Sequence, residues 1–288
     1  MRTITLNLAL STLLLTTAAA VAQSDTTWDK SYAVSGQPSL FLSTGDSHLN
    51  IHACSSCRSV HIHVTSEDTS LSRYTLEESQ SGNTIHFSLK EKPHMGIRVN
   101  WHSSVHVDVE TPANLTLDAR SADGTLTASD LHGDLTIHTS DGNQELTGVS
   151  GNLKLHSSDG HLHVRNASGT LEARSSDGGQ DIAGSFTSLQ LHSSDGSIVL
   201  ELAEGSRLSA DSRIESSDGS VTLRVPKSFP ADLEVSSSDG NIQSTLPLVV
   251  EGYNSKGNSG HSIHGKFNGG GSLLSIHTSD GSVHLATL

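Results

Sequence analysis

Apolar and polar residues alternate along most of the chain with a period of two. The pattern is clearest from residue 135 onward, where the apolar positions are Leu135/Ile137, Leu153/Leu155, Leu162/Val164, Leu171/Ala173, Leu189/Leu191, Val221/Leu223/Val225 and Leu233/Val235. The residues between them are mainly Thr, His, Lys, Ser and Glu. Such alternation is typical of strands that bury one face and expose the other. No window has sustained helical periodicity, so the pattern predicts an all-β protein.

A Ser-Asp-Gly tripeptide or a close variant separates these apolar runs at regular intervals. Its aspartates are Asp123, Asp141, Asp159, Asp177, Asp195, Asp218, Asp239 and Asp280, and the first four intervals are 18 residues each. Glycines nine residues apart, such as Gly142 and Gly151, mark a half-period. Asp-Gly supplies a turn, because glycine tolerates positive φ and Asp can bond to its own downstream backbone. One 18-residue unit therefore holds two short strands and two turns.

The constant period predicts a parallel β-solenoid with about two short strands per 18-residue coil. Coils stacked about 4.8 Å apart would align the leucines inside and the turns along one edge. A single coil cannot bury its own apolar residues, so neighbouring coils must stabilise one another. The alternative fold is an antiparallel β-sandwich, because two-residue Asp-Gly turns also favour hairpins.

The first 22 residues have the features of a signal peptide. Arg2 precedes an apolar run from Leu8 to Leu15, and Ala20-Val21-Ala22 matches an A-x-A cleavage signal. We therefore expect a mature chain from Gln23 that is secreted to the periplasm or the cell surface. No later apolar stretch is long enough to span a bilayer, so we expect no transmembrane segment in the mature chain.

The remaining chain, 23–288, is expected to form a single β-strand-repeat body. Residues 23–110 contain strand–turn–strand patterns of looser spacing, and residues 111–288 contain the regular Ser-Asp-Gly coils. Within the regular part, the Gly-rich segment 246–271 lacks a clean turn signal and is expected to be irregular.

Composition narrows the class of function. The chain has 31 Asp and Glu against 17 Lys and Arg, for a net charge of −14, and it has no basic run. A nucleic-acid partner is therefore not expected, because an acidic protein repels phosphate. Only 3% of residues are aromatic, and neither a nucleophile elbow nor a phosphate-binding loop occurs. These features predict a protein that is not an enzyme.

Two rows of candidate binding residues follow from the repeat register. Three positions before the aspartates lie Arg120, His138, His156, Arg174, His192, Glu215, Ser236 and His277, and the turn row includes Asp141, Asp159, Asp177 and Asp195. Turn formation explains the aspartates, with calcium binding as the alternative. The histidines, 18 in the whole chain, are explained as solvent-facing polar residues. Their functional alternative is a surface that binds a divalent metal ion or responds to pH, whereas the main expectation is no cofactor.

Cys54 and Cys57 form a single C-x-x-C pair. In an oxidising compartment such a pair most simply forms a disulfide that closes a turn. The alternating run that follows, Val60 to Val64, is typical of a strand rather than of the helix that a thioredoxin-like redox motif requires. A metal site using Cys54, Cys57, His52 and His61 has suitable ligand types and remains an alternative.

Two stretches resemble a known family. The run from Val225-Pro226 through Asp239-Gly240-Asn-Ile242 is similar to the bacterial "putative adhesin" β-strand-repeat family of secreted and envelope proteins, and so is Gly265 to Gly271 followed by strand–Ser-Asp-Gly–strand. The resemblance covers roughly residues 30–288 and implies a solenoid-like body with envelope or surface placement. It implies no catalytic residues.

These observations predict a secreted or envelope β-solenoid that acts as a non-catalytic binding, adhesion or scaffold surface. Its expected partner is an envelope or surface protein or a glycan. The alternative is a periplasmic accessory protein that responds to metal or pH through its surface histidines.

Overall fold

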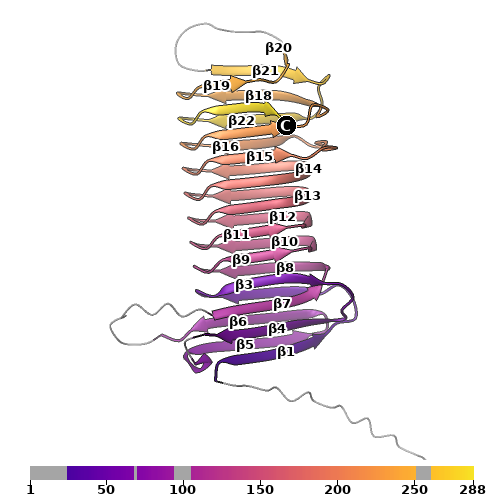
Figure 1. Cartoon of the computed structure of the whole chain (residues 1–288), viewed down its shortest axis with the longest axis vertical. Coiled ribbons are helices and arrows are strands. Elements are labelled where there is room, and N and C mark those ends of the chain that lie inside the picture. The colour runs from indigo at the N-terminus through magenta and orange to yellow at the C-terminus, as the bar shows by residue number, and fades with distance from the viewer. Residues whose placement is uncertain (1–24, 68–69, 94–104, 251–260) are drawn as a thin grey trace, which may run out of the picture.

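The chain folds into a tall stack of short strands, seen in a computed structural model that describes residues 25–67, 70–93, 105–250 and 261–288 (Figure 1). The expected signal peptide over residues 1–22, and residues 251–260 of the expected irregular segment, lie outside the described residues. The described residues contain 23 strands in one continuous sheet and one short 3-10 helix. The predicted all-β solenoid is therefore confirmed.

The strand bounds follow the alternating pattern closely. In chain order they are β1 (Thr27–Ala33), β2 (Ser39–Thr44), β3 (His48–Cys54), β4 (Ser59–Ser66), β5 (Tyr74–Ser81), β6 (Thr84–Glu91), β7 (Val105–Pro112), β8 (Asn114–Ser121), β9 (Leu126–Ser129), β10 (His132–Thr139), β11 (Gln144–Thr147), β12 (Ser150–Ser157), β13 (Leu162–Ser175), β14 (Gln180–Ser193), β15 (Ile198–Leu202), β16 (Ser212–Ser216), β17 (Val221–Val225), β18 (Ala231–Ser237), β19 (Ile242–Ser244), β20 (Val249–Val250), β21 (His261–Phe267), β22 (Leu273–Thr278) and β23 (Val283–Thr287). The 3-10 helix η1 spans Leu71–Arg73.

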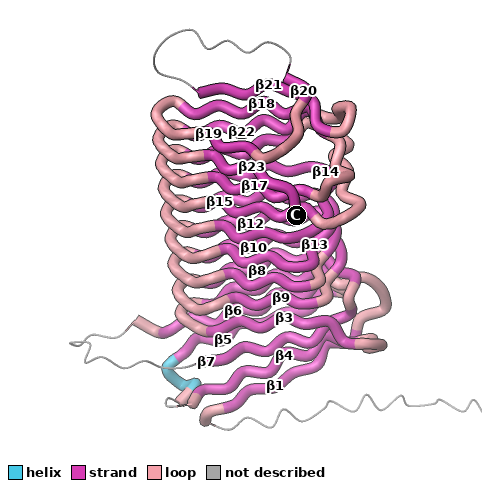
Figure 2. The backbone as a smooth tube through the Cα atoms, turned by 45° about the horizontal axis from the view of Figure 1, so that its top comes forward, coloured by secondary structure: helices cyan, strands magenta, loops and turns pink. Residues whose placement is uncertain are grey.

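The strands line two faces of the stack, which we call face A and face B. Face A consists, in spatial order, of β5, β6, β2, β8, β10, β12, the second halves of β13 and β14, β16, β22, β18, β21 and β20. Face B consists of β1, β4, β7, β3, β9, β11, the first halves of β13 and β14, β15, β17, β23 and β19. The Ser-Asp-Gly turns join face A to face B and line up along one edge (Figure 2).

A thin aliphatic core fills the space between the faces. Leu153 pairs in register with Leu171, and Leu171 pairs with Leu189, so like residues stack as the period predicts. Leu155 and Leu191 are each only 2% exposed, whereas Lys154 between the core positions is exposed. Inward and outward positions of the sequence pattern are thus assigned correctly in these coils.

Replacing an inward leucine should destabilise the stack far more than replacing its outward neighbour. We expect Leu155→Ala to lower the free energy of unfolding by about 2–4 kcal/mol, from lost burial and the cavity left behind. Lys154→Ala, one residue away on the exposed face, should change it by less than about 0.5 kcal/mol. Chemical denaturation of both variants measures the difference, and equal losses would contradict the strand register.

A buried polar seam that the alternating pattern does not predict runs beneath the Ser-Asp-Gly edge. The side-chain amide of Gln144 donates to the His156 carbonyl at 2.6 Å and to the Thr139 hydroxyl at 3.1 Å. Thr139 donates to the Ser157 hydroxyl in the next coil at 3.2 Å. Gln180 makes the same pair of contacts two coils further on. Because buried hydroxyls and amides need partners, this seam fixes the coil register where the aliphatic core ends.

The order of coils along the stack differs from their order along the chain. The coil of β22 and β23 lies between that of β16 and β17 and that of β18 and β19. Figure 1 accordingly shows the C-terminus part-way down the stack. In the row of residues that lie three positions before the aspartates, His277 therefore lies between Glu215 and Ser236, because it pairs with both.

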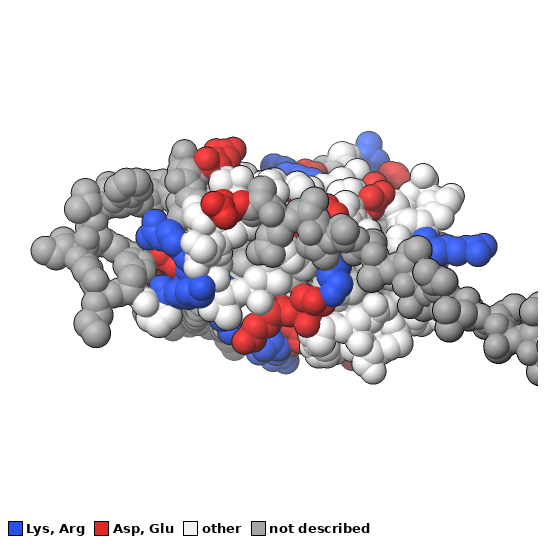
Figure 3. All heavy atoms as spheres, turned by 90° about the horizontal axis from the view of Figure 1, so that it is seen from below, with Lys and Arg blue, Asp and Glu red and all other residues white. Residues whose placement is uncertain are grey.

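The N-terminal end repeats this arrangement. The coil of β2 and β3 lies between the strands β6 and β7 and the coil of β8 and β9. Beyond them, β5 pairs antiparallel with β6, and β4 pairs antiparallel with both β7 and β1. The looser coils expected over 23–110 are thus two parallel layers closed by antiparallel strands. Acidic and basic side chains lie interspersed on the visible part of this end (Figure 3).

Antiparallel strands also close the opposite end. β21 pairs antiparallel with β18, and the two-residue β20 pairs antiparallel with β21. The described parts of segment 246–271 therefore contain paired strands. Among the described residues, no helix has the length and apolar character needed to cross a membrane.

Candidate binding face

Face A carries the predicted row of histidines and arginines. His138 pairs with Arg120 and with His156, His156 pairs with Arg174, and Arg174 pairs with His192. The rings of His138 and His156 lie 5.6 Å apart between centroids and are tilted by 55°. His277 lies further along the same row, separated from His192 by Glu215.

Carboxylates accompany this row at short range. Arg174 forms an ion pair with Glu172 at 2.9 Å, and Arg213 forms one with Glu215 at 2.9 Å. His192 Nδ1 lies 4.0 Å from a carboxylate oxygen of Glu215. All these side chains are at least a third exposed, so solvent screens the pairs and each contributes little to stability. The row is a mixed-charge surface rather than a concentrated positive one.

Protonation of His138 is disfavoured in the folded protein. Partial burial lowers its pKa, the neighbouring His156 and Arg120 lower it further, and Asp118 opposes them. In the unfolded chain the imidazole returns to its ordinary pKa of about 6.5. The unfolded state therefore binds this proton more readily, and the stability that His138 contributes above about pH 6.5 is lost as the pH falls.

We expect a small loss of thermal stability between about pH 7.5 and about pH 5.5 that depends partly on His138. Because the ring is partly exposed, its contribution should stay below about 1 kcal/mol and the fold should persist. Melting temperatures of the protein and of His138→Gln at both pH values measure the effect. A larger loss of stability in the His138→Gln variant than in the unchanged protein would contradict the direction of this pKa shift.

The aspartate row lies at the turn edge, where the backbone amides of the aspartates already donate hydrogen bonds to the preceding coil. The amide of Asp159 donates to the Ser140 carbonyl at 3.0 Å, and the amide of Asp177 donates to that of Ser158 at 3.0 Å. Asp195 repeats the bond to Ser176 at 2.9 Å, and Asp141 donates to Ala122 at 3.2 Å. Each turn is thus pinned to the preceding coil through its main chain.

The metal-ion alternative gains no support from the placement of these residues. In the part of the chain that the structure describes, no group of three or more His, Cys, Asp or Glu side chains has the arrangement of a metal site. The rows are also separated, since the aspartates occupy the turn edge and the histidines occupy face A. A divalent ion on either row stays a prediction.

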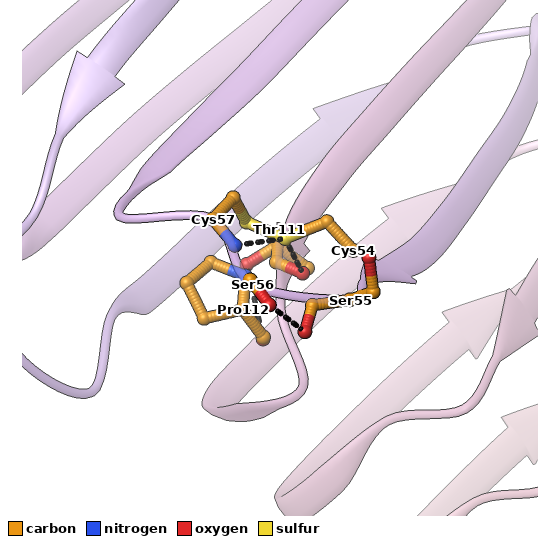
Figure 4. Close-up of a disulfide and its surroundings, with 6 residues drawn as sticks. All are labelled: Cys54, Ser55, Ser56, Cys57, Thr111 and Pro112. Carbon is orange, nitrogen blue, oxygen red and sulfur yellow. Dashed lines mark hydrogen bonds between the residues drawn. A yellow bond between two sulfur atoms is a disulfide. The ribbon is translucent and has the colours of Figure 1, made fainter.

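A disulfide joins Cys54 and Cys57 (Figure 4). Cys54 ends β3 and Cys57 precedes β4, with 5.8 Å between their Cα atoms. The Cys57 amide donates to Cys54 Sγ at 3.3 Å, and that sulfur lies 3.2 Å from the Thr111 carbonyl oxygen. The bridge closes the turn where the chain leaves a parallel coil and enters the antiparallel end. Cys54 and Cys57 therefore have a structural role, which is to close this turn.

A hollow that the sequence pattern does not predict lies at the N-terminal end of face A. It encloses about 560 Å³ over β5, β6, β2 and β8. Phe41 borders it and is 38% exposed, with its ring stacked on that of His86 at 4.6 Å between centroids and 11° between planes. The sequence held a signal for this site, because Leu40 and Leu42 face inward and so require Phe41 to face water.

A second, smaller hollow lies further along the same face and measures about 430 Å³. A polar ladder crosses it, in which Asn152 donates to Asp134 at 2.6 Å and Thr170 donates to Asn152 at 2.9 Å. Lys154 and Glu172 stand beside the ladder. Face A thus offers two hollows lined by hydrogen-bonding side chains on one continuous sheet.

Comparison with known proteins identifies a family. The model of the family described as Toastrack DUF4097 matches residues 38–286. No curated protein matches the chain. The chain is similar to the crystal structure of a "putative adhesin" from Bacteroides fragilis, with 9% identity, a TM-score of 0.46, and coverage of 92% of this chain and 98% of that one. For a "putative adhesin" from Parabacteroides merdae the values are 11%, 0.44, 90% and 96%. For a "putative cell adhesion protein" from Clostridium sporogenes they are 9%, 0.25, 90% and 99%.

Proposed function

The chain belongs to the Toastrack DUF4097 family, and we propose that it is a non-catalytic envelope or secreted protein whose face A binds a surface partner. The observation that carries this proposal is the placement of both hollows on one solvent-facing sheet. The polar rows on that sheet repeat from coil to coil, so they form an extended surface rather than a single constellation of catalytic groups.

A stacked solenoid suits such a role physically. Its strands are held from both sides by ladder hydrogen bonds and by continuous apolar burial, so outward side chains keep fixed spacings. A preordered surface loses little conformational entropy on binding. Secretion, for which the A-x-A signal after the apolar run is the support, would expose this face to envelope proteins and glycans.

Blocking each face separately tests the proposal. Cys54 and Cys57 are joined in a disulfide, so a single added cysteine can carry a bulky polyethylene glycol maleimide. Lys154→Cys places it on face A and Glu145→Cys places it on face B, and both native side chains are exposed. We expect saturable binding of the purified protein to isolated bacterial envelopes, and we expect the Lys154→Cys adduct to lose it.

The Glu145→Cys adduct is the matched control, since it adds the same mass to a neighbouring coil. Equal loss with both adducts would show crowding rather than use of face A. Loss only with the Glu145→Cys adduct would move the binding surface to face B, and absence of envelope binding by the unmodified protein would overturn the proposal.

A further inference from the structure

The floor of the larger hollow consists of two serine side chains between two charged ones. Strand register places Glu77 of β5 opposite Ser88 of β6, Ser88 beside Ser43 of β2, and Ser43 beside Arg120 of β8. These four residues form one outward row, and all of them border the hollow. Because serine is small, the row dips between Glu77 and Arg120 to form a slot with hydroxyls at its base.

Aromatic rings form one wall of this slot. The adjacent outward row holds Ser79, His86, Phe41 and Asp118 in the same strand order. Phe41 and His86 stack on each other and stand beside the two serines. Some large hydrophobic residues in the described ranges are exposed, and Phe41 is the aromatic one among them. Only 3% of the residues are aromatic, yet one phenyl ring lies exposed to solvent at the edge of a hollow. This placement points to a ligand with an apolar surface.

Opposite charges mark the two ends of the slot. Arg120 pairs with Asp118 at 3.1 Å, and it is 62% exposed, so part of its fork of five donors remains available to a ligand. Glu77 at the other end is exposed and supplies acceptors. Three strand spacings separate the ends, or about 14 Å. With one acceptor end and one donor end, the slot does not select for a strongly charged ligand.

One ion pair and one hydrogen bond hold the inner wall of this region. The Glu78 side chain points inward, where the Lys30 ammonium and the Tyr32 hydroxyl both donate to it. Burial and the Glu78 carboxylate raise the pKa of Tyr32, so its hydroxyl keeps its proton and remains a donor. The strand that carries Glu77 is thereby fixed to β1, and the acceptor end of the slot is preordered.

From this geometry we propose that the slot binds a neutral saccharide of two to three pyranose rings. The proposal rests on the proposed function, because it names the ligand class of face A. A pyranose presents C–H groups on its ring face and hydroxyls on its rim. Its apolar face can pack against Phe41, while its hydroxyls bond to Ser43, Ser88, Glu77 and Arg120. The net charge of −14 disfavours a polyanionic glycan.

Isothermal titration of the purified protein with soluble hexasaccharides tests the proposal. The probes are cellohexaose, chitohexaose and maltohexaose, with heparin as the polyanionic comparison. We expect saturable binding of at least one neutral probe, at least tenfold weaker binding after Phe41→Ala or Arg120→Ala, and retained binding after Phe41→Trp. Thr222→Ala on β17, an outward position of face B, is the control and should leave affinity unchanged.

Phe41 and Arg120 are solvent-exposed, so their variants should fold, and circular dichroism with a melting curve checks this. Failure of all three neutral probes, unchanged affinity after Phe41→Ala, or preference for heparin would each overturn the saccharide proposal.

The envelope assay separates this proposal from the broader one. We expect periodate oxidation of envelope glycans to abolish binding and protease treatment to spare it. If the face A adduct still blocks binding while only protease removes the partner, the ligand is a polypeptide. The binding function of face A would then stand without the saccharide.

Discussion

Gly160→Ala should destabilise the protein by about 3 kcal/mol or more, because the added methyl group has no room between two coils. A Cβ on Gly160 would overlap the carbonyl oxygen of Gly142 in the preceding turn. That carbonyl belongs to main chain held in the turn ladder, so it cannot swing aside as the end of a flexible side chain can. Relief requires the two coils to separate locally.

Gly45→Ala is the matched control for this substitution. Gly45 lies in the turn between β2 and β3, and an added Cβ there meets no atom within 4 Å. In the next coil of the stack, the equivalent position holds Ala122, so a side chain is tolerated there. Thermal and urea unfolding of both variants should show a large loss only for Gly160→Ala. Similar small losses would mean that the turn edge is not close-packed.

The glycine row explains why the sequence repeat was so informative. Gly142, Gly160 and Gly178 each sit where a side chain would collide with the coil before, so turn packing demands glycine once per coil. The alternating leucines add a second constraint of the same period. Because both constraints are local and repeat every 18 residues, sequence alone could predict the coils, their register and their core.

The order of the coils along the stack could not be predicted from the repeat. The gap of 41 residues between Asp239 and Asp280 marked an interruption in the repeat. However, strands of the same pattern can pair with any neighbour of that pattern, and the pattern does not say which. In the structure, β21 occupies one side of β18 and closes that end of the stack, and the last coil pairs with the other side of β18.

The candidate site also has one part that the sequence could predict and one part that it could not. The repeat period alone was enough to predict the His row, and the structure brings His138 and His156 side by side as expected. The hollow at Phe41 needed the pairing of β2 with β6, which are separated in the chain by β3, β4 and β5. The alternating pattern shows that Phe41 faces outward, whereas it does not show that His86 is its stacking partner.

Ending the chain at residue 271 should unfold the top of the stack, because the deleted coil is an interior one. Leu274, Ile276, Val283 and Leu285 are each 2% exposed or less. Burying each contributes about 1.5–3 kcal/mol, or about 6–12 kcal/mol together. A whole domain is typically stable by only about 5–15 kcal/mol, so the loss is comparable with the total. β18 and β19 would also lose their parallel partners.

We therefore expect the truncated protein to show protease cleavage within residues 231–250 and a lower unfolding midpoint, while β8 to β15 stay protected from hydrogen exchange. Nearest-neighbour stabilisation in a solenoid confines the damage to the coils next to the gap. A synthetic peptide of residues 272–288 should restore protection, because it can pair with strand edges on both sides of the gap. Retained protection of residues 231–250 without the peptide would mean that β18 and β19 stack on β16 and β17 unaided. The last coil would then be dispensable, and its interior position would not be what holds the top of the stack together.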